Sequence, residues 1–324
     1  MRRRALRSGL RLTEIGFGAA QFGNLFVETT DAASEAAVQT ALEGGIRYFD
    51  TAPHYGLGLS ERRLGRALAG VPRDDYVLST KVGRLLEPSP ENAGRLDDQG
   101  FVVPATTRRV WDFSRDGVLR SIESSLGRLG TDRIDIVYLH DPDEHWAAAS
   151  TTGIATLIEL REQGVLGAVG VGMNQSAMPA EFVRQTDVDL VMVAGRFTLA
   201  DQGALADLLP LARERGVGVV AAAAYNSGLL SARRVPDEVF FDYGPAPAEV
   251  IDRARRIARV CEEHGVTLPD AAVQYPLRHP AVVSVVLGSR TPAHVRSTLE
   301  RYAAPVPEEL WTTLDAAGLV PDPR

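Results

Sequence analysis

Short apolar runs alternate with amphipathic stretches along nearly the whole chain, and this order constrains the fold more than any other feature. Eight runs have the length and composition of strands that are buried on both faces, namely residues 15–20, 46–50, 76–81, 134–140, 168–172, 190–194, 217–224 and 282–287. Each is followed by a stretch of helical period, namely residues 32–43, 60–68, 115–129, 153–163, 176–185, 204–215, 248–264 and 292–301. Such alternation requires a parallel sheet, and eight units of this kind close a barrel. We therefore predict that residues 1–324 form one α/β domain, a (β/α)₈ TIM barrel.

An open, doubly wound sheet is the competing arrangement, and its dinucleotide-binding form places G-x-G-x-x-G directly after an early strand. Residues 16–21 read GFGAAQ and residues 170–175 read GVGMNQ, so both segments lack the third glycine. The barrel is therefore favoured.

Two long polar connections, residues 83–113 and 226–247, follow the carboxyl ends of predicted strands. Barrel enzymes carry their active sites at this end, so we expect the connections to shape a substrate pocket. The alternative is that either one is a mobile insertion without ligand contacts. The residues before Ile15 are expected to form a hairpin that plugs the opposite end of the barrel.

Composition argues against several classes of protein. The 324 residues include 35 basic and 42 acidic side chains, which gives a formal charge of 35 − 42 = −7. The densest basic group, Arg253, Arg255, Arg256 and Arg259, fits the solvent face of a helix better than a nucleic-acid site. No apolar run reaches the roughly 20 residues of a membrane span, and no secretory segment follows the early arginines. Since a single cysteine, Cys261, also fits a reducing compartment, we expect a cytoplasmic protein without nucleic-acid or membrane partners.

Four polar residues are expected to meet at one mouth of the barrel. Asp50 ends the second predicted strand, Lys81 the third and His140 the fourth, while Tyr55 lies in the loop after Asp50. The carboxyl ends of adjacent parallel strands meet in space, so these side chains can converge there. Together they suit proton transfer at a carbonyl or hydroxyl oxygen, with the Lys81 ammonium favouring the Tyr55 phenolate, Asp50 holding the ammonium and His140 orienting the oxygen.

Each of the four residues also has an ordinary structural explanation. Asp50 could cap a turn, Lys81 could be exposed to solvent, Tyr55 could be packed, and His140 could satisfy a buried carbonyl. Four such coincidences at the ends of consecutive strands are improbable, so the catalytic interpretation is preferred. A metal site in residues 140–145, which read HDPDEH, is disfavoured because a loop does not make these ligands converge as a helical H-E-x-x-H does.

Five segments resemble the aldo-keto reductase superfamily. They are residues 48–56 (YFDTAPHYG), 58–61 (GLSE), 79–81 (STK), 135–140 (DIVYLH) and 170–174 (GVGMN), in the order and spacing of that family. The resemblance implies an NAD(P)-dependent oxidoreductase on a barrel, with Asp50, Tyr55, Lys81 and His140 as the catalytic tetrad. Hydride would pass between the nicotinamide and the substrate carbon while Tyr55 gives or takes the proton, so no metal is needed.

The same resemblance implies the residues that bind the cofactor. They are Gly18, Ala19, Ala20, Asp50, Met173, Asn174, Tyr225, Ser227, Gly228, Leu229, Gly288, Ser289, Arg290, His294 and Thr298. In this scheme Asn174 binds the carboxamide of the nicotinamide and Tyr225 stacks on its ring, although Asn174 could instead cap a helix and Tyr225 could simply pack. The loop at residues 227–229 would lie over the pyrophosphate, where small residues let the backbone amides approach.

Departures from the family pattern leave the choice of cofactor open. Met173 and Ala194 stand where serine and glutamine are common, so nicotinamide binding would depend more on the neighbouring asparagine. Gly288 and His294 stand where members strict for NADP carry basic residues, which leaves Arg290 as the cation for an adenosine 2′-phosphate. NADP, NAD or both are therefore possible cofactors, and Arg290 could also be an exposed loop cation.

Residues 113–130, the connection before them and the segment LHDPD at 139–143 are most similar to a bacterial branch of the family. That branch contains dehydrogenases of L-fucose, of D-threo-aldoses and of pyridoxal, so the resemblance implies oxidation of an aldose to its lactone, with pyridoxal oxidation or general aldehyde reduction as alternatives. His54, Trp111, Phe113 and Trp146 are the expected substrate contacts, although ordinary loop packing explains them equally well. A regulatory or binding subunit and a barrel without nicotinamide are more remote alternatives. A monomer or small homo-oligomer is expected.

Overall fold

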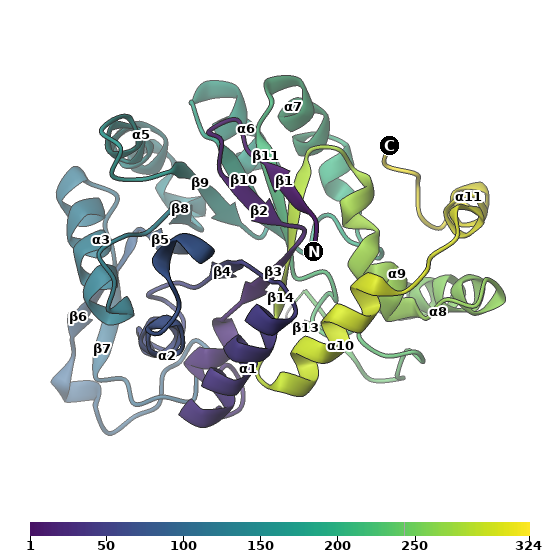
Figure 1. The fold of residues 1–324 in the computed structure, drawn as a ribbon, viewed down its shortest axis with the longest axis horizontal. Helices are drawn as coiled ribbons and strands as arrows, with labels where there is room; N and C mark the ends of the chain where they lie inside the picture. The colour runs from purple at the N-terminus through teal and green to yellow at the C-terminus, as the bar shows by residue number, and fades with distance from the viewer. Residues whose placement is uncertain (243) are drawn as a thin grey trace.

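The computed structural model, which describes residues 1–242 and 244–324, contains a closed barrel of eight parallel strands (Figure 1). The strands are β3 (Ile15–Gly18), β4 (Tyr48–Asp50), β5 (Val77–Val82), β8 (Ile136–His140), β9 (Ala168–Met173), β10 (Leu190–Ala194), β11 (Gly218–Ala222) and β14 (Val282–Gly288). Their order around the barrel is β10-β11-β14-β3-β4-β5-β8-β9, so each barrel strand lies next to its predecessor in the chain. The predicted (β/α)₈ architecture is confirmed.

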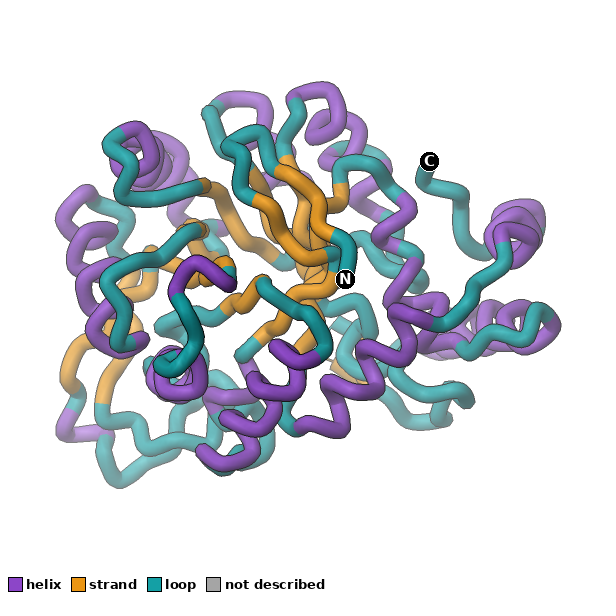
Figure 2. The backbone as a smooth tube through the Cα atoms, in the orientation of Figure 1, coloured by secondary structure: helices purple, strands orange, loops and turns teal. Residues whose placement is uncertain are grey.

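Helices surround most of the strands, as Figure 2 shows. Those that connect or follow the barrel strands are α1 (Asp31–Glu43), α2 (Leu59–Leu68), α3 (Arg115–Leu129), α5 (Ile154–Glu162), α6 (Ala177–Gln185), α7 (Leu208–Arg215), α8 (Ala248–Glu263) and α10 (Pro292–Ala303). The short α4 (Trp146–Ala148), α9 (Leu268–Gln274) and the later α11 (Glu308–Ala316) were not predicted. The helix predicted from residue 204 begins instead at Leu208, because the Asp207 side chain accepts the Leu208 N–H and caps it there.

An antiparallel hairpin plugs the amino end of the barrel, as predicted. It consists of β1 (Arg3–Ala5) and β2 (Arg11–Thr13). Leu6 and Leu12 from the hairpin are buried in the same apolar cluster as Tyr48, Ile136 and Met192, which fill the barrel interior. The interior is therefore a packed core rather than a pore.

Both long connections leave from the carboxyl ends of barrel strands and carry strands of their own. In the first, β6 (Arg84–Pro88) pairs antiparallel with β7 (Thr107–Trp111), and Phe101 between them bridges to Leu25 of the loop after β3. In the second, β12 (Phe240–Phe241) pairs with β13 (Gly244–Pro245). The first connection is thus tied to the rim of the barrel by backbone hydrogen bonds.

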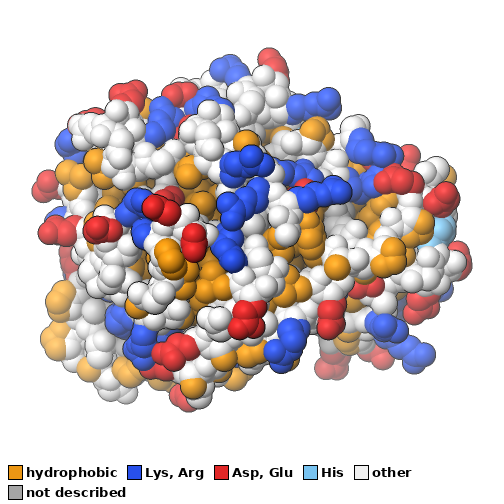
Figure 3. Space-filling model, viewed as in Figure 1, with side chains coloured by type: hydrophobic (Ala, Val, Ile, Leu, Met, Phe, Trp, Pro, Cys, Tyr) orange, Lys and Arg blue, Asp and Glu red, His pale blue; other side chains and the backbone are white. Residues whose placement is uncertain are grey.

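Acidic and basic side chains are mixed over much of the surface in Figure 3, with a group of basic residues over the amino-terminal hairpin. Arg256 and Arg259 of α8 are exposed, as predicted, whereas Arg253 is half-buried and donates to the Leu319 and Ala200 carbonyls. Within residues 1–242 and 244–324, no helix is both long and apolar enough to span a bilayer.

Candidate active site

A buried ion pair lies at the carboxyl ends of β4 and β5. The Lys81 ammonium donates to Asp50 Oδ2 at 2.7 Å and to the Thr51 carbonyl at 2.9 Å, and its side chain is 2 % exposed. Ser79 Oγ donates to the other carboxylate oxygen of Asp50, also at 2.7 Å. Burial alone would lower the pKa of Lys81, but the Asp50 carboxylate and the Tyr55 hydroxyl outweigh it and raise that pKa. Lys81 is therefore a permanent cation at this end of the barrel.

Tyr55 and His140 complete the cluster around this cation. The Lys81 ammonium lies 4.8 Å from the centroid of the Tyr55 ring. The His140 ring stands edge-on to the Tyr55 ring, with centroids 5.8 Å apart. His140 ends β8, the neighbour of β5 in the barrel. The structure thus brings together the four residues that the strand ends predicted.

Close backbone contact positions the loop that carries Tyr55. A Cβ atom on Gly56 would overlap the Gly23 carbonyl, and one on Gly23 would overlap the Tyr55 backbone, so both positions require glycine. Gly56 also has a φ of 60°, which glycine adopts without strain. Ser60 Oγ donates to the Ala19 carbonyl at 2.6 Å and ties the far end of the same loop to the loop after β3.

Burial controls the protonation of the phenol and the two imidazoles. It raises the pKa of Tyr55 to about 12, although the Lys81 ammonium opposes the rise. Burial likewise lowers the pKa of His140 well below its ordinary value and that of His54 to about 2, with Arg84 adding to both effects. We expected the ammonium to favour the phenolate. It does act in that direction, but the desolvation of the phenolate outweighs it, so Tyr55 is a neutral phenol and both histidines are neutral at pH 7.

Two of the four predicted substrate residues, His54 and Trp111, border the mouth, whereas Phe113 is 3 % exposed and packs in the outer core. The His54 ring is edge-on to His140, with centroids 5.5 Å apart. Trp111 stacks on the buried Phe113 at 5.9 Å and is 42 % exposed. Trp146 instead packs against Phe182 of α6, at 4.9 Å between centroids, in the outer core. That packing gives Trp146 partners in the outer core, and its substrate role stays a prediction.

Comparison with known proteins shows the family to which this chain belongs. The family model described as the aldo/keto reductase family matches residues 14–318. The chain belongs to the aldo/keto reductase family. It is 45% identical to D-threo-aldose 1-dehydrogenase from a Pseudomonas species over 98% of both chains. It is 39% identical to pyridoxal 4-dehydrogenase from Microbacterium luteolum, again over 98% of both. Among solved structures, the holo form of an aldo-keto reductase from Bacillus halodurans matches with a TM-score of 0.75 at 27% identity, covering 99% of this chain and 96% of that one. This aldo-keto reductase is therefore an NAD(P)-dependent oxidoreductase.

The rim of the reductase barrel at β3 and β14 suits a cofactor with polar groups. Gly18 and Gly288 pair there, and a Cβ atom on Gly288 would collide with the Gln21 side-chain amide. Gln21 Oε1 and Arg290 Nε are buried and have no hydrogen-bond partner among the described residues, while Arg290 Nη2 donates to the Leu25 carbonyl at 2.7 Å. Buried polar atoms without partners indicate a place for ligand atoms. The residues present therefore fit a nicotinamide dinucleotide at this rim.

The remaining residues predicted to hold the adenosine end lie nearby. The Ser289 N–H donates to the Gly18 carbonyl at 3.3 Å, and Thr298 is buried in α10. His294 is exposed, and its Nδ1 accepts from the Arg290 N–H at 3.4 Å. Ala19 is buried and Ala20 half-buried at the end of β3, so they can offer a ligand little beyond their backbone.

Asn174 keeps its side-chain amide at the mouth of the reductase. Its Nδ2 is 3.4 Å from Asp141 Oδ1, and the residue is exposed. The side chain that accepts the Met178 N–H at the start of α6 is that of Gln175, so Asn174 is not needed as a cap. Met173 is 2 % exposed and can reach a ligand only through its backbone.

Tyr225 faces α10 rather than the barrel axis. Its hydroxyl accepts from Arg301 Nη1 at 2.7 Å, and its ring packs against the outer core. The strand β11 ends at Ala222, which contacts the interior cluster instead. The structure thus shows Tyr225 held by Arg301 of α10, and the predicted stacking on nicotinamide stays a prediction.

The loop after Tyr225 differs from the prediction in one respect. Asn226 and Ser227 have left-handed backbones, and Gly228 has a φ of 104°. The N–H groups of Asn226, Gly228 and Leu229 donate to carbonyls of the same loop, at 2.8, 3.0 and 3.2 Å. Those three amides are therefore not available to a pyrophosphate, because the tight turn already uses them.

Sequence reasoning missed several charged residues at the mouth. Arg84 Nη2 donates to Asp141 Oδ2 at 2.5 Å, and Arg109 binds both carboxylate oxygens of Asp97 and donates to the His54 carbonyl at 2.9 Å. Asp141 follows His140 directly and Arg84 opens the long connection, which were usable signals. The place of Arg109 depends on how β6 and β7 pair, and the sequence gives no signal for that.

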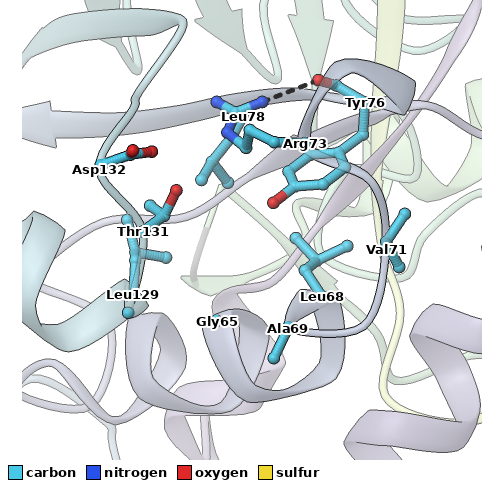
Figure 4. Close-up of a pocket in the computed structure, with 11 residues that line it drawn as sticks. Gly65, Leu68, Ala69, Val71, Arg73, Tyr76, Leu78, Leu129, Thr131 and Asp132 are labelled. Atoms are coloured by element: carbon cyan, nitrogen blue, oxygen red, sulfur yellow. Dashed lines mark hydrogen bonds between the residues drawn. The ribbon is translucent and has the colours of Figure 1, made fainter.

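A hollow at the opposite end of the barrel has a different character (Figure 4). It lies between α2, the start of β5 and the end of α3, and Leu68, Tyr76 and Leu129 form its apolar wall. Arg73 at its edge donates to the Tyr76 carbonyl at 3.0 Å, the bond drawn in the figure, and to Asp135 at 2.6 Å. None of the predicted site residues lines it.

Proposed function

We propose that this aldo-keto reductase oxidises a free aldose, such as L-fucose or a D-threo-aldose, to its lactone. The observation that carries the proposal is the buried Lys81–Asp50 pair beneath Tyr55, beside the neutral His140. The choice of sugar is supported by the relative named D-threo-aldose 1-dehydrogenase, which is similar over nearly the full length of both chains.

The four residues divide the proton chemistry among them. Tyr55 exchanges a proton with the anomeric hydroxyl oxygen, since its ring lies 4.8 Å from the Lys81 ammonium while the Asp50 carboxylate is already paired with that ammonium. Lys81 stabilises the phenolate form that oxidation requires, and Asp50 holds the ammonium in place. Neutral His140 donates a hydrogen bond to the same substrate oxygen and orients it. Hydride transfer to or from the substrate carbon would be the chemistry that a bound nicotinamide supplies.

The chain's own residues would hold the cofactor at the rim already described. We assign Asn174 to the nicotinamide carboxamide and Gln21 and Arg290 to the adenosine half, since the latter two carry buried polar atoms without partners. Members strict for NADP carry several basic residues for the adenosine 2′-phosphate, whereas this chain offers the single guanidinium of Arg290. We therefore propose both NAD and NADP as cofactors. A cytoplasmic location and a monomer or small homo-oligomer remain predictions.

The test is a substrate panel followed by nicotinamide absorbance at 340 nm. The panel offers the oxidised cofactor, NAD or NADP, with L-fucose, D-threose or pyridoxal. It offers the reduced form of each cofactor with a simple aliphatic aldehyde. We expect the highest kcat/KM with an aldose. Turnover of pyridoxal alone would replace the proposal with the activity named for the second relative, and cofactor binding without any turnover would favour a binding subunit.

A further inference from the structure

An ion pair that belongs to none of the predicted site residues stands at the mouth of the barrel. Arg84 opens the long connection at the end of β5, and Asp141 directly follows β8, the neighbouring strand. Their side chains are 12 % and 20 % exposed and meet at 2.5 Å. Asp141 has a φ of 43°, in the left-handed region that costs a non-glycine residue about 1 kcal/mol or more. Strain of this kind persists where surrounding structure demands a particular side-chain position.

The pair is in contact with the residues proposed to do the chemistry. Asp141 Oδ2 lies 3.5 Å from Nε2 of His140, and its Oδ1 lies 3.4 Å from the amide of Asn174. The Arg84 guanidinium carbon lies 4.5 Å from the centroid of the exposed Trp111 ring. A polar pair flanked by an aromatic face is an arrangement that binds a sugar ring, with hydroxyls on the pair and C–H groups on the indole.

Buried polar atoms around the pair lack partners. Nε of Arg84, Nε of Arg109 and Nδ1 of His54 are all buried and make no hydrogen bond within residues 1–242 and 244–324. Unsatisfied buried donors and acceptors are rare in folded proteins because each costs about 1–3 kcal/mol. Three of them around one mouth indicate that a ligand with several hydroxyl groups supplies the missing hydrogen bonds.

The charges at the mouth cancel. Lys81 is paired with Asp50, Arg84 with Asp141, and Arg109 with Asp97. His54 and His140 are neutral, because burial and neighbouring cations lower the pKa of both. Each of the three cations is therefore already neutralised, so a phosphate or carboxylate on the substrate would find no uncompensated cation and would be repelled by Asp141.

We propose that Arg84 and Asp141 form a hydroxyl-recognition subsite that selects uncharged polyhydroxylated substrates and rejects their phosphorylated or carboxylated counterparts. Asp141 accepts hydrogen bonds from substrate hydroxyls, Arg84 donates to them, and the ring of Trp111 covers one face of the sugar. The subsite rests on the proposed aldose oxidation, because it acts on the same bound substrate.

The test compares a neutral sugar with its anionic counterpart, L-galactose with L-galactose 6-phosphate, in three forms of the full chain. In the wild type we expect kcat/KM to favour the neutral sugar by about a hundredfold. Asp141→Asn removes a hydrogen-bond acceptor charge and leaves Arg84 unpaired, so kcat/KM for L-galactose falls about tenfold. Because the repelling charge is gone, the preference for L-galactose over its 6-phosphate shrinks by about tenfold or more. Arg84→Met leaves the Asp141 carboxylate unpaired, so kcat/KM falls for L-galactose but falls further for the phosphate, and the preference for the neutral sugar grows.

Opposite effects of the two variants on the preference separate recognition from a merely structural role, which would lower both substrates in parallel. Glu159→Gln breaks the exposed ion pair with Arg115 and is the matched control, with both the preference and kcat/KM unchanged. Equal wild-type turnover of the two sugars, or parallel losses in both mouth variants, overturns the subsite while leaving aldose oxidation intact. Turnover of pyridoxal but of no sugar overturns the proposed function and the subsite together.

Discussion

The two ends of the barrel treat their polar groups in opposite ways. At the amino end, buried carboxylates are fully partnered: Asp135 accepts from Arg73 and from the Leu78 N–H, and Asp189 accepts from Arg161 at 3.0 Å as well as from a backbone N–H. Asp189 also accepts from Arg7 in the turn of the amino-terminal hairpin, so these bonds join the strands to the hairpin and to the helix layer.

At the carboxyl end, backbone strain and unpaired groups accumulate. Among the described residues, every non-glycine residue with a left-handed backbone lies in a loop that follows a strand at this end: Asn24, Phe26, Leu57, Asp141, Ala223, Asn226, Ser227 and Asp242. Most buried side-chain atoms without partners lie there as well, those of Gln21, His54, Arg84, Thr107, Arg109 and Arg290. Both features lower folding stability. Their concentration at the carboxyl end indicates that this end serves ligand binding, whereas the amino end serves the stability of the fold.

The largest effect should come from the carboxyl end, through Tyr55→Phe. Removing the proton-transferring hydroxyl should lower kcat about a thousandfold, with the melting temperature and cofactor affinity nearly unchanged. Tyr76→Phe is the matched control, because Tyr76 borders the hollow at the amino end. Full activity in the Tyr55 variant would refute the proposed role of the phenol.

At the amino end, Asp189→Ala should lower the stability of the fold and leave kcat unchanged. This change leaves Arg161 and the Val169 N–H without their buried partner, which should lower the free energy of unfolding by about 3 kcal/mol in urea titrations. The kcat per folded molecule should stay the same. Glu181→Ala, which breaks an exposed pair with Arg184, should cost less than about 1 kcal/mol. A loss of kcat without a loss of stability would contradict the division between the ends.

Acid should weaken the fold through the carboxyl end. Burial lowers the pKa of His54 to about 2 from an ordinary 6.5, and that of His140 also falls well below the ordinary value. As pH falls below 6.5, the two histidines bind protons in the unfolded chain but stay neutral in the folded chain. The free energy of unfolding therefore declines by about 1.4 kcal/mol per pH unit for each histidine. Urea unfolding at pH 7.5 and 5.0 measures the decline, and His54→Asn should make it shallower. The same slope in that variant would show that His54 does not contribute.

The smallest expected effect concerns Arg290, at the cofactor rim. Arg290→Ala should weaken NADP binding about tenfold and NAD binding much less, since the guanidinium is assigned to the 2′-phosphate. Fluorescence titration of both cofactors gives the two dissociation constants. Equal weakening of NAD and NADP binding would indicate that Arg290 contacts a group that both cofactors share rather than the 2′-phosphate.

The barrel could be predicted because its signal is local. Apolar runs and helical periods appear within about ten residues, and β10 and α3 have the bounds expected from them. The tetrad could be predicted because its members end adjacent strands, which follows from topology alone.

Other properties depend on tertiary packing and could not be predicted. The direction of Tyr225 follows from where β11 ends, two residues earlier than expected. The place of Arg109 follows from the pairing of β6 with β7, and the high pKa of Tyr55 follows from the depth of its burial. No pattern along the chain encodes any of these.

The contact between Gly23 and Gly56 has a consequence for how such an enzyme changes during evolution. Because two loops touch backbone to backbone there, neither glycine can be replaced by a larger residue without moving the loop that carries the phenol. Between β6 and β7 the chain meets the rim at Phe101, whose ring lies 6.2 Å from that of Tyr55, so this hairpin supplies part of the wall beside the phenol. Activity toward new substrates is therefore best sought by replacing the β6–β7 hairpin as a unit, while the four residues of the proposed proton transfer stay unchanged.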